Sequence, residues 1–100
     1  MIEPNARPEI ERVDRASGGA YRLNVDGHVA EMTFSRAGER LIIIDHTEVP
    51  AALRGRGLGE QLVARAVEDA RGEGKKIVPL CRFAAAQFRR HPEFSDVLSR

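Results

Sequence analysis

Residues 54–59 read RGRGLG, and residues 60–67 follow without a break as EQLVARAV. The first segment is a loop of alternating glycines, and the second has the apolar spacing of an amphipathic helix. The most apolar run of the chain, residues 41–44, comes shortly before them. A strand, a glycine loop and a helix start in this order predict an anion site. The N–H groups of the loop and of the first helical turn converge there, and the helix dipole favours negative charge. Because Arg54 and Arg56 add positive charge, the sequence predicts a site for a phosphate or a pyrophosphate.

The spacing of the glycines separates three kinds of phosphate-binding loop. A P-loop has the pattern G-x-x-x-x-G-K-[ST], and no Lys-Ser or Lys-Thr pair follows here. A dinucleotide-binding fingerprint has the pattern G-x-G-x-x-G, but Gly59 comes one position early and the chain is too short for a doubly wound sheet. The remaining pattern is R-x-x-G-x-G, formed by Arg54, Gly57 and Gly59. Taken alone, the loop can also be a plain strand-to-helix turn with solvated arginines.

The R-x-x-G-x-G pattern resembles the acetyl-CoA pyrophosphate loop of the GNAT N-acetyltransferase superfamily. Three flanking segments add to the resemblance: HTEVP at residues 46–50, VPLC at residues 78–81 and HPEF at residues 91–94. Together they look like the compact single-domain members of the superfamily, and the likeness covers roughly residues 20–98. These compact proteins lack the N-terminal helices of larger GNAT enzymes, and no convincing helix precedes Tyr21 here.

The composition is that of one small globular domain. The 100 residues are 42% apolar, and 16 basic against 15 acidic residues give a net charge of +1. This balance argues against a general nucleic-acid or membrane surface, and no apolar run reaches the ~18 residues of a membrane span. A single cysteine excludes an internal disulfide. Together with an N-terminus unlike a signal peptide, it predicts a cytoplasmic protein. Residues 1–9 are expected to form a flexible tail and residues 10–100 one domain.

Upstream of the loop, the sequence predicts an antiparallel meander. Its segments alternate between apolar and polar residues as strands do, and Asp26-Gly27 between two of them is a strong hairpin signal. The last segment is apolar on both faces, so it should be a central strand. The predicted strands span residues 10–15, 20–25, 28–34 and 40–46, with turns at residues 17–19, 26–27 and 36–39.

Downstream of the loop, the sequence predicts a crossover and a second helix. A helix over residues 58–71, ended by Gly72 and Gly74, leads to a short strand over residues 76–80. Strand, helix and strand imply a parallel pair with a right-handed crossover. A second helix is expected over residues 83–90. The fold class is therefore α+β, an antiparallel meander plus one parallel βαβ crossover with two helices. The resemblance further implies that the strands at the crossover splay apart and hold the thioester in the gap.

Cys81 and His46 are the candidate reactive side chains. Both end strands of the predicted parallel pair, at the edge where open sheets bind ligands. Cys81 also starts a helix, beside Arg82, which favours a thiolate; the alternative is a buried apolar cysteine. An imidazole that titrates near neutral pH suits His46 to the role of a base, flanked by Asp45 and Glu48; the alternative is a solvated strand-end histidine. The resemblance implies that His46 and Cys81 form the active-site pair.

The sequence leaves the role of Cys81 open. The thiol could take the acetyl group as a transient thioester, or it could polarise or deprotonate the incoming amine. Many GNAT enzymes carry a tyrosine on the last helix that protonates the departing thiolate, whereas this region holds Phe83, Phe88 and Phe94, and the only tyrosine is Tyr21. No spacing of histidines and cysteine supports a metal site.

The leading hypothesis is an acetyl-CoA-dependent N-acetyltransferase that acts on an unidentified amine, a small molecule or a protein. The main chain near Val49 would bind the pantetheine arm as if it were another strand. A non-catalytic module that binds CoA or acyl-CoA is the second hypothesis, and a plain interaction domain is the third. The loop expected to bind the pyrophosphate of the cosubstrate comprises Arg54, Gly55, Arg56, Gly57, Leu58 and Gly59.

Overall fold

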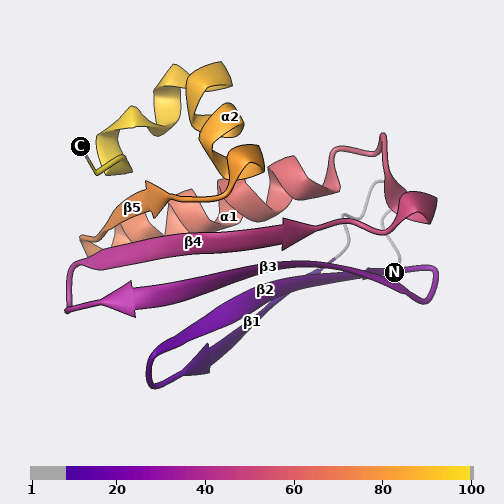
Figure 1. The fold of residues 1–100 in the computed structure, drawn as a ribbon, viewed down its shortest axis with the longest axis horizontal. Coiled ribbons are helices and arrows are strands. Elements are labelled where there is room, and N and C mark those ends of the chain that lie inside the picture. The colour runs from indigo at the N-terminus through magenta and orange to yellow at the C-terminus, as the bar shows by residue number, and fades with distance from the viewer. Residues whose placement is uncertain (1–8, 100) are drawn as a thin grey trace, which may run out of the picture.

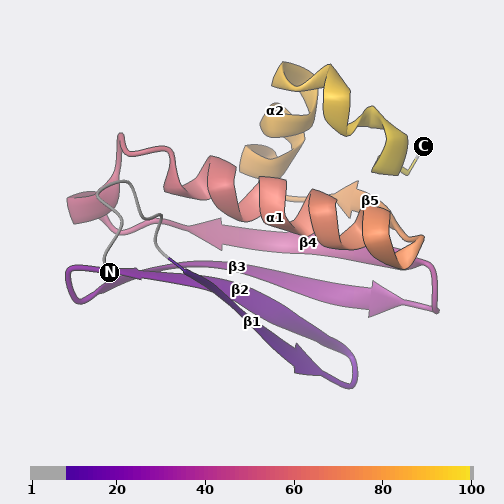
Figure 2. The same cartoon turned by 180° about the vertical axis from the view of Figure 1, so that it is seen from behind.

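The computed structural model describes residues 9–99 as a single mixed sheet with two main helices (Figure 1). The strand order is β1-β2-β3-β4-β5. Figure 2 shows α1 running along one face of this sheet. The tail predicted over residues 1–9 lies, apart from Glu9, outside the described residues. The elements are β1 (Ile10–Arg15), β2 (Gly18–Val25), β3 (His28–Ala37), β4 (Leu41–Glu48), η1 (Ala51–Leu53), α1 (Leu58–Glu73), β5 (Lys76–Pro79), α2 (Arg82–Arg90) and η2 (Pro92–Val97).

The first four strands form the predicted antiparallel meander. Asp26 and Gly27 turn the chain between β2 and β3 with φ values of 53° and 81°, the backbone that a tight hairpin requires. The hairpin prediction is therefore confirmed. The third turn lies at residues 38–40 and not at 36–39, since β3 continues to Ala37.

The turn predicted at residues 17–19 is wrong, because Gly18 and Gly19 belong to β2 and the turn lies at residues 16–17. A Cβ atom on Gly18 would lie 2.2 Å from the carbonyl oxygen of Phe34, and one on Gly19 would lie 2.1 Å from that of Val13. The two glycines allow the backbones of neighbouring strands to approach closely.

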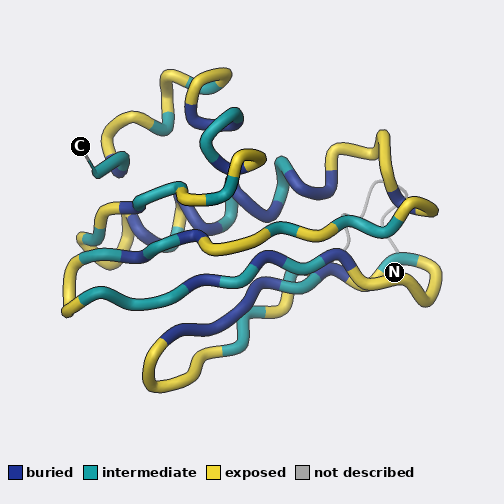
Figure 3. Tube along the Cα trace, in the orientation of Figure 1, coloured by how far each residue is buried: buried dark blue, intermediate teal, exposed yellow. Residues whose placement is uncertain are grey.

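The core lies between the sheet and the helices. Buried positions run along β2, β3 and the inner side of α1, and the turns are exposed (Figure 3). Alternate residues of β3 are buried, as the sequence pattern predicts for a strand with one covered face. The largest fully buried side chains are Leu23, Met32, Ile44, Leu53, Leu62, Ile77, Val63 and Val67.

Strand β4 is central, and it changes partners along its length. Its first half pairs in parallel with β5, up to Ile44 opposite Pro79. Its second half, as far as Glu48, pairs only with β3. The pairing with β3 shifts by one residue, because Thr33 lies opposite His46 while Phe34 lies opposite Ile44. Asp45 is thus the extra residue of a β-bulge.

Helix α1 begins at Leu58 as predicted and ends two residues later than expected, at Glu73. Gly72 lies within the helix, and only Gly74 ends it, in the left-handed conformation with φ of 70°. A mid-helix glycine costs some stability but does not break a helix that is packed along one side. In the part of the chain that the structure describes, neither α1 nor α2 is long and apolar enough to cross a membrane.

The chain after β5 packs beside the edge of the sheet that β5 forms. Helix α2 packs against α1, β4 and β5, and the short helix η2 returns the chain toward β5. There Leu98 pairs with Ile77 as an isolated parallel bridge. This bridge fixes the end of the chain against β5.

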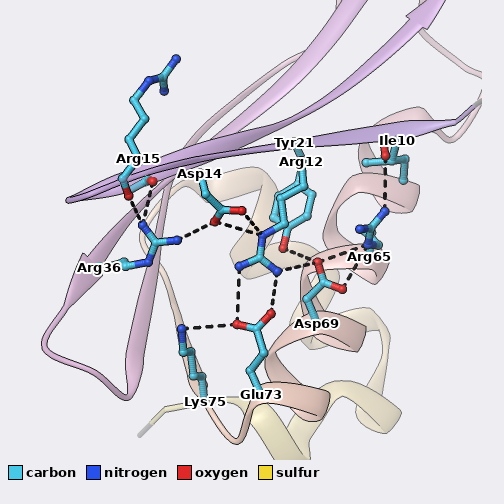
Figure 4. A network of polar contacts seen from close by, with 11 residues as sticks. Ile10, Arg12, Asp14, Arg15, Tyr21, Arg36, Arg65, Asp69, Glu73 and Lys75 are labelled. Carbon is cyan, nitrogen blue, oxygen red and sulfur yellow. Dashed lines mark hydrogen bonds and ion pairs between the residues drawn. The ribbon is translucent and has the colours of Figure 1, made fainter.

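A network of polar contacts fastens β1 and β2 to the C-terminal half of α1 (Figure 4). The Tyr21 hydroxyl donates to Asp69 Oδ2 at 2.7 Å, and Arg12 Nη1 donates to the same oxygen at 3.0 Å and to Glu73 at 2.6 Å. Burial raises the pKa of Tyr21, and its bond to Asp69 adds to the effect. Burial by itself would raise the pKa of Asp69, but the donors Tyr21 and Arg65 hold it below its usual value.

Candidate functional site

A cleft of about 460 Å³ opens at the N-terminus of α1, between the end of β4 and helix α2. The glycine loop forms one wall of the cleft and α2 the other. Its lining combines backbone of the loop with apolar side chains and a few polar ones, which is typical of sites that hold a small organic ligand. The lining residues are Thr47, Val49, Leu53, Arg54, Gly55, Gly57, Leu58, Gly59, Glu60, Phe83, Gln87 and Arg90.

The glycines of the loop serve two different purposes. Gly55 and Gly57 have φ values of 84° and 72°, and Gly57 caps α1 in the left-handed conformation. Nothing lies within 4 Å of a Cβ built on either residue, so both present open backbone to the cleft. Gly59 is buried in the first turn of α1, where a Cβ would lie 2.6 Å from the Phe83 ring. Gly59 therefore lets α1 and α2 pack closely.

The two arginines of the loop differ in position. Arg54 lines the cleft, and its Nε donates to the carbonyl oxygen of Val49 at 3.2 Å. Arg56 does not line the cleft, and its Nη1 lies 3.6 Å from Asp26 Oδ2 in the hairpin turn between β2 and β3. Arg54 is thus the arginine placed to meet an anion at the start of α1, while Arg56 contributes charge from further away.

Cys81 caps α2 and lies next to the end of β4. Its Sγ accepts a hydrogen bond from the Ala84 backbone N–H at 3.4 Å and lies 3.5 Å from the Thr47 hydroxyl oxygen. Leu80, on one side of the thiol in sequence, is 67% exposed, and Phe83 nearby is 38% exposed. Two accessible apolar side chains therefore lie close in sequence to the half-buried thiol.

His46 is on the opposite face of the sheet from the covered core. It pairs with Thr33, whereas the next residue, Thr47, pairs with the buried Met32 and therefore faces the helices. Without the bulge at Asp45, His46 would share the inner face with Ile44. The structure thus brings Thr47, and not His46, into contact with Cys81.

The outer face of the sheet carries a second hollow, of about 450 Å³. Glu48 lines it, two residues after His46 and directly opposite Glu31 of β3. His46 and Glu48 therefore share the outer face, while the cleft opens on the other side of β4. The hollow is lined by Glu9, Glu11, Arg22, Asn24, Val29, Glu31 and Glu48.

A contact between a histidine and two carboxylates joins the two helices beside the cleft. His91, just after α2, lies with its Nε2 2.8 Å from Glu60 Oε2 in the first turn of α1 and its Nδ1 3.1 Å from Glu93 Oε2. The hydrogen bonds to Glu60 and then to Glu93 raise the pKa of His91. The imidazolium form therefore ties the end of α2 to the start of α1.

Comparison with known proteins identifies the family. A model of the family described as GCN5-related N-acetyl-transferase matches residues 20–97. This chain belongs to the GCN5-related N-acetyltransferase family. It is 26% identical to "Protein NATD1" of Gallus gallus over 92% of this chain and 84% of that protein, and 28% identical to the Homo sapiens protein of that name over 91% and 80%. Glucosamine 6-phosphate N-acetyltransferase 1 of Oryza sativa is 47% identical over 70 residues, which are 68% of this chain and 41% of that protein.

Solved structures agree with this assignment. A GCN5-like protein from Staphylococcus aureus, determined by NMR in solution, matches this family member with a TM-score of 0.73 and 30% identity, over 91% of this chain and 87% of that one. An IAA acetyltransferase from Bacillus cereus shares the fold, with a TM-score of 0.58 and 22% identity over 74% of this chain and 53% of that one. The predicted family and fold class are confirmed.

Six residues that line the cleft were not among the site residues that the sequence predicted: Thr47, Leu53, Glu60, Phe83, Gln87 and Arg90. Thr47 faces the cleft only because of the bulge, which leaves no mark in the sequence. Gln87 lines the cleft from α2, and it did leave a signal, since it is a polar residue on a helix face otherwise formed by Ala84 and Phe88. The single tyrosine is held by Asp69 and does not line the cleft. Among residues 9–99, no three His, Cys, Asp or Glu side chains are grouped as metal ligands.

Proposed function

We propose that this protein transfers the acetyl group of acetyl-CoA to an amine. The observation that carries the proposal is the cleft at the start of α1, where open glycine backbone, a helix N-terminus and Arg54 meet. A pyrophosphate bound there would accept hydrogen bonds from the backbone N–H groups of residues 55–59 and pair with Arg54, while Arg56 adds charge from outside.

The pantetheine arm would extend from the loop along the free side of β4. Pairing of β4 with β5 stops at Ile44, so the segment from Asp45 to Val49 has no strand on that side among the described residues. An arm with two amides can pair with such backbone as a further strand does. This path leads from the loop past Val49 and Thr47 to the thiol of Cys81.

The acetyl group would then lie near Cys81. In one route, the thiolate of Cys81 attacks the acetyl carbonyl carbon, the C–S bond to CoA breaks, and the amine displaces the acetyl group from Cys81. In the other, the amine attacks acetyl-CoA directly and Cys81 polarises or deprotonates it. His46 would take the proton of an amine that arrives at the gap between β4 and β5 from the outer face of the sheet.

The test is titration calorimetry of the purified protein with acetyl-CoA and with CoA, followed by mass spectrometry of the same samples. We expect micromolar binding of both ligands. An acetyl adduct that disappears in Cys81→Ala would establish the route through the thiol, and acetyl transfer to an amine without an adduct would establish direct transfer. In either case Cys81→Ala should cut turnover strongly and leave CoA affinity nearly unchanged; unaltered turnover would overturn the role of Cys81.

The loop has a matched pair of variants. Arg54→Gln removes the charge that lines the cleft and should weaken acetyl-CoA binding about tenfold, the effect of losing a hydrogen bond to a charged group. Arg56→Gln makes the same chemical change outside the cleft and should have a smaller effect. Equal affinities for both variants and the original protein would refute the loop as the pyrophosphate site.

A non-catalytic module that binds CoA is the second candidate, and the position of the tyrosine favours it. The hydroxyl of Tyr21 is committed to Asp69, and Phe83, Phe88 and Phe94 in and after α2 carry no proton to give. A CoA thiolate can leave without an acid because its pKa is about 8.5, so transfer remains chemically open. Binding of CoA without acetyl transfer to any amine in a broad acceptor screen would favour the binding module.

A further inference from the structure

Gln87 is a buried polar side chain without a complete set of partners. It lies in the middle of α2 and is 4% exposed. Within residues 9–99, no other charged or non-aromatic polar side chain is as deeply buried. Its Oε1 accepts no hydrogen bond in the part of the chain that the structure describes. The same side chain lines the cleft at the start of α1.

This arrangement costs stability in the free protein. An amide oxygen removed from water without a partner costs about 1–3 kcal/mol, and the neighbouring positions on this face of α2, Ala84 and Phe88, are apolar and buried. A leucine or methionine at position 87 would complete the apolar face without the cost. A polar group in such a place is explained when its partner is a bound ligand.

The chemistry of Gln87 indicates which part of a ligand it meets. A neutral amide is matched by another amide, which both donates and accepts hydrogen bonds. The phosphates, in contrast, have Arg54 and the free N–H groups of the loop. Gln87 lies six residues beyond Cys81 along the chain, and six residues of helix rise about 9 Å. A pantetheine arm whose sulfur is near Cys81 has its two amides within that reach.

We propose that Gln87 binds an amide of the pantetheine arm of the cosubstrate through its side-chain amide. Because Oε1 is enclosed in the free protein, the amide turns about its terminal torsion angle when the arm enters, and Oε1 then accepts the hydrogen bond of an arm N–H group. The inference rests on the proposed function and assigns a residue to the part of the ligand that the glycine loop does not hold. Gln87 is a binding residue on this view, and the bond that it lacks in the free protein forms when the arm enters.

The experiment compares Gln87→Leu with Gln61→Leu, the same chemical change in α1 at a residue outside the cleft lining. Each protein is titrated with acetyl-CoA and with 3′-phospho-ADP, the nucleotide part of CoA without the arm. In Gln87→Leu we expect acetyl-CoA to bind about five- to tenfold more weakly, as for one lost hydrogen bond. Binding of 3′-phospho-ADP should not change, and the melting temperature without ligand should rise. In Gln61→Leu, neither affinity should change.

Other results would overturn the assignment. Unchanged acetyl-CoA affinity in Gln87→Leu would mean that the amide is a core residue that destabilises the fold and binds no ligand. An equal loss of affinity for both ligands would mean that Gln87 acts on the nucleotide or on the shape of the cleft. Gln87→Met, which keeps an unbranched chain of similar length, replaces the leucine variant if that one does not fold, with the same criteria. If the original protein binds neither ligand, the proposed function itself fails, and this result is distinct from the others.

Discussion

The hydroxyl of Tyr21 offers the sharpest test at the scale of one residue. Tyr21 is 3% exposed and donates to Asp69 Oδ2 at 2.7 Å. Tyr21→Phe keeps the ring in the core but leaves a half-buried carboxylate oxygen with one donor fewer. We expect a loss of about 1–2 kcal/mol in the free energy of unfolding, measured by urea denaturation. Acetyl-CoA affinity should stay the same, because Tyr21 does not line the cleft. A loss below about 0.3 kcal/mol would show that Arg12 and Arg65 satisfy Asp69 without the hydroxyl.

The positions of some site residues follow from local sequence, whereas those of others depend on how the strands pair. The sequence correctly predicted where the glycine loop lies, because Gly55 and Gly57 take positive φ just before a helix, a local property that spacing records. It could not predict which residue contacts Cys81, because that depends on a single inserted residue in β4 that moves Thr47 to the inner face. The roles assigned to His46 and Cys81 stay predictions.

At the scale of one element, the end of α1 gives a matched pair of glycine variants. Gly72 lies inside the helix with nothing within 4 Å of its would-be Cβ, whereas Gly74 ends the helix with φ of 70°. Gly72→Ala should stabilise the protein by about 0.5–1 kcal/mol, since alanine restricts the unfolded chain and favours helix. Gly74→Ala should destabilise it by about 1 kcal/mol, because the left-handed conformation strains any Cβ. Chemical denaturation of both variants measures whether the free energy of unfolding rises or falls. A lower free energy of unfolding in Gly72→Ala would contradict the helical position of Gly72.

The elements themselves were predictable where local pattern and packing agree. The strands around Asp26-Gly27 and the apolar stripe of α1 were recovered from periodicity. The start of β2 was not, because Gly18 and Gly19 resemble a turn in sequence, while their actual role is close packing between Val13 and Phe34. That role depends on partners distant along the chain, which a local pattern does not contain.

At the scale of the whole molecule, the site is assembled where segments far apart in sequence meet. The end of β4, the start of α1 and one side of α2 form the cleft, and the contacts between α1 and α2 set its width. On one side Gly59 lets Phe83 approach α1 closely, and beside it His91 pairs with Glu60. His91 is therefore a titratable group in the contact between the two helices.

The stability of the protein should consequently depend on pH through His91. Its pKa is raised in the folded state by Glu60 and then by Glu93, so the folded protein holds the proton more tightly than the unfolded chain does. The stabilisation is fully present below the unfolded value of about 6.5 and is lost as the pH rises through the folded value. Thermal unfolding of the original protein and of His91→Gln should therefore differ more at pH 5.5 than at pH 8.5, with the original protein the more stable at pH 5.5.

In a Glu60→Gln background the difference at pH 5.5 should shrink, because the first of the two carboxylates is gone. A larger difference at pH 8.5 would reverse the sign of the linkage. It would show that His91 stabilises the protein mainly as a neutral ring stacked on Phe94 of η2, whose ring centroid lies 4.8 Å from that of His91.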